Sequence, residues 1–180
     1  TSTYQNSSAI SANGAVVVFE GSISGQSATP VWARNRQTAS TQLLSKDLGG
    51  QADSGNHRNL SISADGRYVV FESAAANLVS GDTNNSIDLF LADRNTGLIK
   101  RIDVSTSGQQ ASVGAGLGAI SADGRYVAFA SFANDLDTTV PQNGFGYNVY
   151  VRDLVNNTTK RINITSTNTN GTTGSGSPNL

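Results

Sequence analysis

The chain has 180 residues, a formal net charge of −1 and 14% charged residues. This length is enough for one domain with a hydrophobic core. The near-neutral charge excludes the basic surfaces that bind nucleic acids or anionic membranes. No apolar run approaches the roughly 20 residues that span a bilayer, so we expect no membrane insertion. The chain has no cysteine, which excludes disulfides and thiol chemistry.

One short segment occurs three times along the chain. It reads "SAISANGAVVVFEG" at 8–21, "LSISADGRYVVFES" at 60–73 and "GAISADGRYVAFAS" at 118–131. The Asp-Gly or Asn-Gly pair is typical of a tight turn, because glycine adopts positive φ and Asp or Asn caps the turn. The alternating apolar residues on either side are typical of strands. Each copy therefore predicts two strands joined by a hairpin turn.

Two more predicted strands follow in each copy. No window shows helical periodicity, and the turns between these strands are rich in Asn and Gly. The sequence therefore predicts a single all-β domain of three four-stranded antiparallel blades. The second-to-last strands are expected at 30–35, 88–93 and 148–153, and the last strands at 41–45, 99–105 and 159–165. The expected blades are about 3–54, 55–112 and 113–170, with 171–180 as a strand-like or linker tail.

This pattern resembles the TolB-like, WD40-like repeats of bacterial β-propellers. A blade of that kind reads much like "SADGRYVAF", then "DxFVRD", then "TxRI". The second and third copies match closely, while the first departs from the pattern at Asn13, Ala15 and Asn35. The resemblance covers nearly the whole chain and implies a propeller fold. It leaves function open, because propellers host enzymes, scaffolds and lectins.

Three blades are too few to close a propeller, which has about four to eight. Each blade has two apolar faces, so the end faces need a cover. Three arrangements would supply this cover: two chains that pair into six blades, further blades in a longer protein, or a filament of open blades. We expect a non-catalytic extracellular structural or interaction module that self-associates through open blade faces or strand exchange, as a homo-oligomer or filament.

The C-terminal segment offers a second route to assembly. "GSPNL" at 176–180 resembles "NHRNL" at 56–60, which precedes the second turn motif. Strand addition to another chain would use such a segment. The alternative is a linker to another domain. The residues of this assembly tail are Ser177, Pro178, Asn179 and Leu180.

The segment "GDTNNSID" at 81–88 is rich in side chains with oxygen atoms that could bind a metal. Asp82, Asn84, Ser86 and Asp88 stand at alternate positions, which is how calcium-binding loops place oxygen ligands. The glycine at position 6 and the glutamate at position 12 of an EF-hand are absent. The alternative is an Asx-rich turn before a strand. No cofactor is required by the sequence, and calcium is the one it suggests.

Aromatic residues fall into two groups. Trp32, Phe90 and Tyr150 occupy equivalent strand positions, so we predict that they form the core between blades. The third copy adds others in and beside its long loop, 134–148. Such aromatics stack on a sugar ring or dock a protein partner, or they fold back over the blade edge. These ligand or partner contacts are Phe132, Phe145 and Tyr147.

Signals for catalysis are absent from the sequence. There is no Gly-x-Ser-x-Gly elbow, since "GSISG" at 21–25 has isoleucine at its centre. The single histidine, His57, is too little for a zinc site and is expected on the surface or lining the channel. We therefore expect no enzyme. The alternatives are a ligand-binding propeller segment for a glycan or protein, and a fragment of a propeller-containing hydrolase.

The surface composition bears on location. Ser, Thr, Asn and Gly are abundant and lysine is scarce, a balance typical of secreted bacterial β-proteins. We therefore expect a secreted, extracellular protein of a bacterium, with the periplasm as the alternative.

Overall fold

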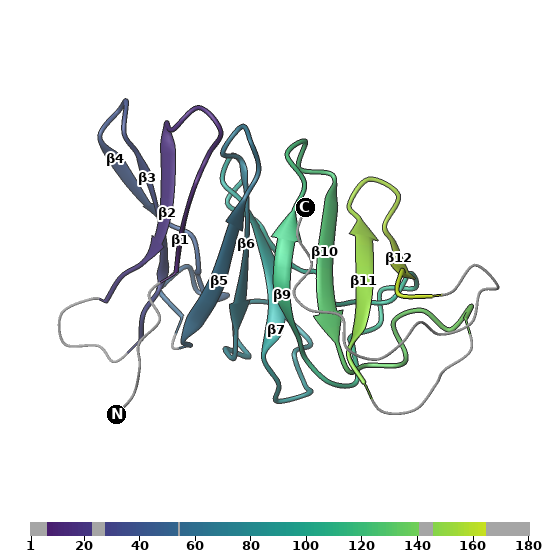
Figure 1. Cartoon of the computed structure of the whole chain (residues 1–180). Helices are drawn as coiled ribbons and strands as arrows, with labels where there is room; N and C mark the ends of the chain where they lie inside the picture. Colours follow the sequence, from purple (N-terminus) through teal and green to yellow (C-terminus); the bar gives the residue numbers. More distant parts are fainter. Residues whose placement is uncertain (1–6, 23–27, 54, 141–145, 165–180) are drawn as a thin grey trace.

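A computed structural model describes residues 7–22, 28–53, 55–140 and 146–164 of the protein. They form three four-stranded antiparallel sheets, each with its strands in chain order, which follow one another without closing a ring (Figure 1). The predicted fold is confirmed. The described residues contain no helix that could cross a membrane.

Blade 1 contains β1 (Ser8–Ile10), β2 (Val16–Glu20), β3 (Val31–Asn35) and β4 (Ser40–Leu43). Blade 2 contains β5 (His57–Ile62), β6 (Tyr68–Ser73), β7 (Asp88–Asp93) and β8 (Ile99–Arg101). Blade 3 contains β9 (Ala115–Ile120), β10 (Tyr126–Ser131), β11 (Asn148–Asp153) and β12 (Thr158–Arg161).

The repeated motif closes the first hairpin of every blade with its own polar atoms. In blade 2, Ser63 Oγ donates to Asp65 Oδ1 over 2.6 Å and accepts from the Tyr68 N–H over 3.0 Å. Gly66 takes the positive φ of 75° that the turn requires. The same bonds form in blade 3, and in blade 1 an asparagine replaces the aspartate. The motif therefore builds a turn, as predicted.

The motif also joins neighbouring blades. The Ala12 N–H donates to the Ala64 carbonyl over 3.1 Å, and the Ala64 N–H donates to the Ala122 carbonyl over 2.9 Å. We call this row of bonds between turns the turn ladder. A Cβ added to Gly124 would lie 2.6 Å from Cδ2 of Tyr68 in the preceding blade. Small residues in the motif thus allow the turns to touch.

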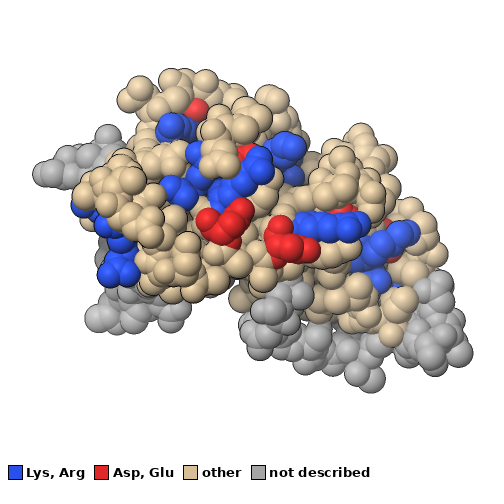
Figure 2. Space-filling model, turned by 90° about the horizontal axis from the view of Figure 1, so that it is seen from above, with Lys and Arg blue, Asp and Glu red and all other residues tan. Residues whose placement is uncertain are grey.

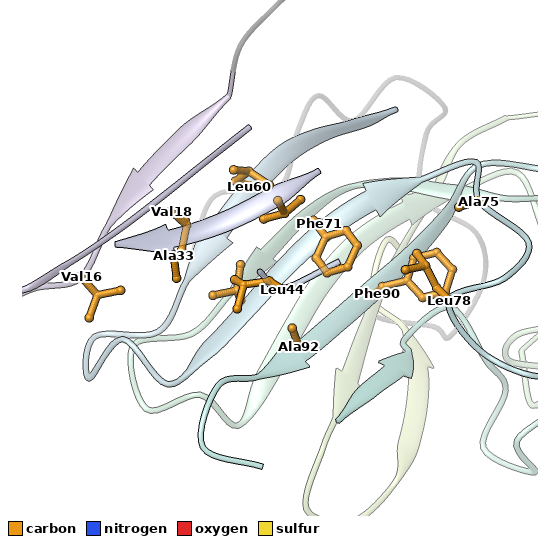
Figure 3. Close-up of a cluster of buried hydrophobic side chains, with 12 residues drawn as sticks. Val16, Val18, Ala33, Leu44, Leu60, Phe71, Ala75, Leu78, Phe90 and Ala92 are labelled. Atoms are coloured by element: carbon orange, nitrogen blue, oxygen red, sulfur yellow. The ribbon is translucent and has the colours of Figure 1, made fainter. Parts of the chain in front are cut away.

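Two hydrophobic clusters hold the blades together, one at each blade-to-blade junction. Val69, Phe71 and Phe90 of blade 2 pack on valines and a leucine of blade 1, and their side chains converge between the two sheets (Figure 3). Phe129 and Tyr150 of blade 3 pack in the same way on the other side of blade 2. Blade 2 therefore buries apolar side chains on both of its faces.

The outermost strands are shorter than predicted, because a side chain takes over the pairing. β8 ends at Arg101, and the Leu89 N–H of the neighbouring strand then donates to Asp103 Oδ1 over 3.2 Å. Ser45 and Asn163 accept the equivalent N–H groups in blades 1 and 3, over 3.0 and 3.1 Å. Three different residue types thus play one structural role.

Two glycine substitutions test the contact between turns. Gly124 and Gly97 both have positive φ, 73° and 74°, but a Cβ at Gly97 would meet nothing within 4 Å. We expect Gly97→Ala to lower the free energy of unfolding by about 1 kcal/mol through backbone strain alone. Gly124→Ala should cost about 1–3 kcal/mol more, because Tyr68 must also move. Urea unfolding measures both values, and equal losses would contradict the close packing of the turns.

Candidate functional site

The equivalent residues of blades 2 and 3 show what a blade buries on its backward face, the face toward the preceding blade. Phe71 and Phe90 of blade 2 pair across β6 and β7, and both are fully buried. Phe129 and Tyr150 of blade 3 pair in the same register and are buried as completely. Their rings stack with centroids 5.9 and 5.6 Å apart. A backward face therefore needs a neighbouring blade to cover an aromatic pair.

Blade 1 carries the same pair without that cover. Phe19 and Trp32 pair in the same register across β2 and β3, and both are partly exposed. Ile10 is 56% exposed, whereas its equivalent in blade 3, Ile120, is 6% exposed. The prediction of a core position was therefore wrong for Trp32 and right for the equivalent Phe90 and Tyr150, because no described blade precedes blade 1.

The forward face of a blade is the face toward the following blade, and no described blade follows blade 3. Leu44 and Ile102 occupy equivalent positions on the forward faces of blades 1 and 2 and are 4% and 2% exposed. Their equivalent in blade 3, Ile162, is 50% exposed. Tyr126 and Val151 beside it are partly exposed. On the same face, Val149 and Ala128 are buried, at 7% and 2%. Blade 3 thus exposes part of the apolar side chains that its predecessors use to bind a following blade.

The turn ladder also ends on open groups. Within the described residues, the Ala122 N–H donates to no acceptor and the Ala12 carbonyl accepts no hydrogen bond. The ladder has a direction, since each turn donates to the turn of the following blade. One end of the stack therefore offers a donor and the other an acceptor.

A groove lies at the end of blades 2 and 3 where β9 begins. Phe132 and Tyr147, which the sequence singled out, meet there with ring centroids 3.7 Å apart. Both are about half exposed, at 51% and 48%. They line the groove together with Arg58 and Glu72, and Glu72 was not predicted as a site residue. Its clue in the sequence is that the first two copies end the motif strand with glutamate and the third does not.

Two of the predicted calcium residues, Asp82 and Asp88, lie beside a cation that the protein itself supplies. The Arg101 guanidinium lies 3.4 Å from Asp82 Oδ2 and 3.4 Å from Asp88 Oδ2. Gln110 Nε2 donates to the same two carboxylates over 3.1 and 3.0 Å. Asn84 Nδ2 donates to Asp88 Oδ1 over 2.9 Å. Arg101 and Gln110 come from distant positions, so the sequence pattern of the loop could not reveal them.

These contacts bear on calcium binding. Ser86 donates its N–H to Asn84 Oδ1 over 3.0 Å, which is the Asx turn that the sequence offered as the alternative. Among the described residues, no group of three or more His, Asp or Glu side chains is placed to hold a metal ion. The carboxylates of Asp82 and Asp88 share protein donors, Gln110 and Arg101. Calcium stays a prediction that this donor set does not favour.

Asp103 lies fully buried beside this cluster. Burial and the nearby Asp88 charge raise the pKa of Asp103 well above its usual range. Its Oδ1 accepts the Leu89 N–H, while its Oδ2 has no hydrogen-bond partner. An uncharged side chain therefore suits this position better than a carboxylate. At the equivalent position blade 3 has an uncharged side chain, Asn163.

Arginine clasps fasten the motif to the third strand of its own blade. Arg67 donates to both oxygens of Asp93 over 3.0 and 2.8 Å, which holds the pKa of Asp93 at about 2. Arg125 binds Asp153 in the same way. Both basic and acidic side chains lie on this end of the molecule (Figure 2).

His57 is buried, contrary to the surface or channel position that we predicted. Its Nδ1 lies 3.0 Å from the Thr29 carbonyl oxygen, and its Nε2 lies 3.1 Å from Asp53 Oδ2. The Phe71 ring packs beside it at 5.4 Å. The ring thus ties blade 2 to the segment before β3, which is a structural task. Phe145 and the tail residues Ser177, Pro178, Asn179 and Leu180 lie outside the described residues.

The substitution Asp103→Asn tests the buried carboxyl. Because folding raises the pKa of Asp103, the wild type loses stability as pH rises above about 4, the value in the unfolded chain. The variant should therefore be more stable at pH 7 by on the order of 1 kcal/mol, since an unsatisfied buried group is removed. The gain should vanish below about pH 4, where Asp103 is protonated in both states. Thermal unfolding across this range measures it.

Asp123→Asn is the matched control. Hydrogen bonds from Ser121 and from the Arg125 N–H lower the pKa of the exposed Asp123, so this carboxylate favours folding at neutral pH. Asn13 fills the same turn position in blade 1. The control should not gain stability at pH 7. A gain for Asp103→Asn that is the same at every pH, or no gain at all, would contradict the assignment.

Comparisons with known proteins agree with the fold. No protein-family model and no curated protein sequence matches the chain. The structure of TolB from Acinetobacter baumannii aligns with a TM-score of 0.53 and 18% identity, over 87% of this chain and 32% of that one. A putative TolB from Agrobacterium tumefaciens aligns with a TM-score of 0.55 and 17% identity, over 89% and 50%.

A third similar structure is the β-propeller domain of the Trilobed protease from Pyrococcus furiosus, which has an open velcro topology. It aligns with a TM-score of 0.54 and 14% identity, over 83% of this chain and 39% of that one. The chain thus spans about a third to a half of these proteins. At such identities the likeness concerns the fold. The described residues therefore have the fold of three β-propeller blades, similar to those in the TolB structures.

Proposed function

We propose that this chain is a non-catalytic interaction module that self-associates head to tail. The forward face of blade 3 in one copy packs on the backward face of blade 1 in a second copy. Two such contacts in a pair of chains close a ring of six blades. One observation carries the proposal: Ile10 and Ile162 are half exposed or more at the two ends of the stack, whereas their equivalents Ile120 and Ile102 are buried between blades.

The two junctions inside the chain show which side chains of a forward face and a backward face meet. Inside the chain, Leu44 and Ile102 of forward faces are buried against the aromatic pairs of backward faces. The junction between copies would place Ile162 against Phe19 and Trp32. Burying apolar surface contributes about 25 cal/mol per Å², so a junction of this kind favours association.

Direction comes from the turn ladder. Face-to-face pairing of two forward faces would set an Ala122 N–H against another N–H. Head-to-tail pairing sets the Ala122 N–H of one copy toward the Ala12 carbonyl of the other, as inside the chain. A head-to-tail contact forms a closed ring when its rotation closes, and an open filament when it does not. A pair of three-blade chains gives a blade number within the range of closed propellers.

A structural task is consistent with the polar groups of the described residues. The single histidine is buried against Asp53, and the arginines of the clasps bind carboxylates of their own blade.

We place the module outside the bacterial cytoplasm, in the periplasm or secreted, because of its polar, lysine-poor composition without cysteine. Cell fractionation with a tagged chain tests the location, and a purely cytoplasmic signal would contradict it.

Native mass spectrometry tests the assembly. We expect the wild type to have the mass of two copies of the 18.6-kDa chain. Ile162→Asp places a charge on the forward face of blade 3 and should give a monomer, because an unpaired charge is not buried at a junction. Ile10→Asp should do the same from the backward face of blade 1. Both positions are half exposed or more, so circular dichroism should show an unchanged fold.

Leu98→Asp is the control for these variants. Leu98 is 60% exposed in a turn of the middle blade, away from both end faces. This variant should keep the mass of the wild type. Wild type that stays monomeric at about 0.1 mM, a concentration at which even weak contacts are populated, would contradict the proposal. Blades supplied by a longer chain would then be the cover for these faces.

A further inference from the structure

The groove beside Phe132 has the size and the walls of a small-molecule site. It encloses about 570 Å³, within the range of about 300–1,000 Å³ of ligand pockets. Blade 2 contributes Arg58, Glu72 and the segment 86–87, and blade 3 contributes the segment 114–117 and the two aromatic rings. Every residue that lines the groove therefore comes from one copy of the chain.

The aromatic pair of this groove is not required by the blade. Ala74 and Ile87 of blade 2 occupy the positions equivalent to Phe132 and Tyr147. Ala74 is exposed, so this position has no core role there. The core of blade 3 is instead filled by Phe129 and Tyr150, which are fully buried. Blade 3 thus carries two large rings where blade 2 has an alanine and an isoleucine.

The floor of the groove is opened by a second departure from the repeat. Glu20 and Glu72 end the motif strand in blades 1 and 2, and Ala130 stands at that position in blade 3. Ala130 pairs with Gly116 across β10 and β9, and both line the groove. A glutamate at position 130 would place a carboxylate on this floor. Two small residues leave the space free.

The polar wall of the groove is fixed and nearly neutral. Glu72 is 3% exposed, and its carboxylate accepts from Arg58 Nε over 2.9 Å and from Asn59 Nδ2 over 2.7 Å. The backbone N–H of Leu117 in blade 3 also donates to it over 2.5 Å. The Arg58 side chain is 55% exposed, so its remaining N–H groups face outward. One carboxylate and one guanidinium compensate each other and leave donors and acceptors side by side.

We propose that this groove binds a neutral sugar. The apolar C–H face of a pyranose ring packs on the exposed faces of Phe132 and Tyr147, since such rings give large, rigid apolar contacts. The sugar hydroxyls, which are both donors and acceptors, pair with the guanidinium of Arg58 and the amide of Asn59. Few convergent polar groups beside an apolar platform are what orient a small ligand.

Titration of the isotope-labelled chain with neutral hexaoses tests the proposal by NMR. Cellohexaose and the hexaose of N-acetylglucosamine are the probes, and hexagalacturonate is the charged comparison. We expect at least one neutral probe to shift the backbone amides of Gly116 and Leu117 and the side-chain signal of Asn59. The same shifts should appear with Ile162→Asp, because the groove lies within one copy. Failure of assembly and failure of sugar binding are thereby distinguished.

Two variants place the sugar in the groove. Phe132→Ala should weaken binding about threefold to tenfold, the usual value of one aromatic contact. Ala130→Glu restores the residue that blades 1 and 2 carry, so it should fold and should weaken binding at least as much by filling the floor. Leu98→Ala, at the opposite end of blade 2, should change nothing. Shifts that spread over the surface, unchanged affinity in both groove variants, or no response to either neutral probe would overturn the proposal.

Discussion

A four-stranded blade with apolar side chains on both faces cannot be stable alone, because either face exposed to water forfeits its burial. In this chain the middle blade satisfies the requirement on both sides. Val70 and Leu89 point toward blade 3, while Val69 and Phe90 point toward blade 1. The same requirement explains why Ile10 and Ile162, at the two end faces, are exposed while their equivalents between blades are buried.

Polar bonds between blades add direction to this apolar packing. The turn ladder runs from each turn to the following one, and the carboxylate of Glu72 accepts the Leu117 N–H of the following blade. Hydrogen bonds of this kind contribute about 1 kcal/mol each, which is small beside the burial of an aromatic pair. Their importance lies in geometry. They distinguish the head-to-tail junction from other ways in which two apolar faces could meet.

The sequence was sufficient for local structure, since the determinants of each strand and turn lie close together. The Ser-Ala-Asp-Gly turns and the strand at 148–153 were both predictable from repeated positions. Contacts between distant segments were not. Nothing in the loop at 81–88 shows that Arg101 and Gln110 will occupy it, because they come from another strand and another turn.

End effects were also outside the reach of a repeat pattern. Equivalence with Phe90 predicts burial of Trp32, but burial depends on a preceding blade and not on the residue. The aromatic pair of the groove was found because it breaks the repeat, while the polar wall was missed because Glu72 conforms to it. Residues that differ between the repeats therefore indicated surface features. Residues that the repeats share gave no sign of the contacts between blades.

Mixing the two charged variants measures the head-to-tail junction most directly. A chain with Ile10→Asp keeps an intact forward face, and a chain with Ile162→Asp keeps an intact backward face. Each variant alone should be monomeric, and an equimolar mixture at about 0.1 mM should form a one-to-one dimer through the single intact junction. A dimer of the Ile10→Asp chain alone, or a mixture that remains monomeric, would contradict head-to-tail association.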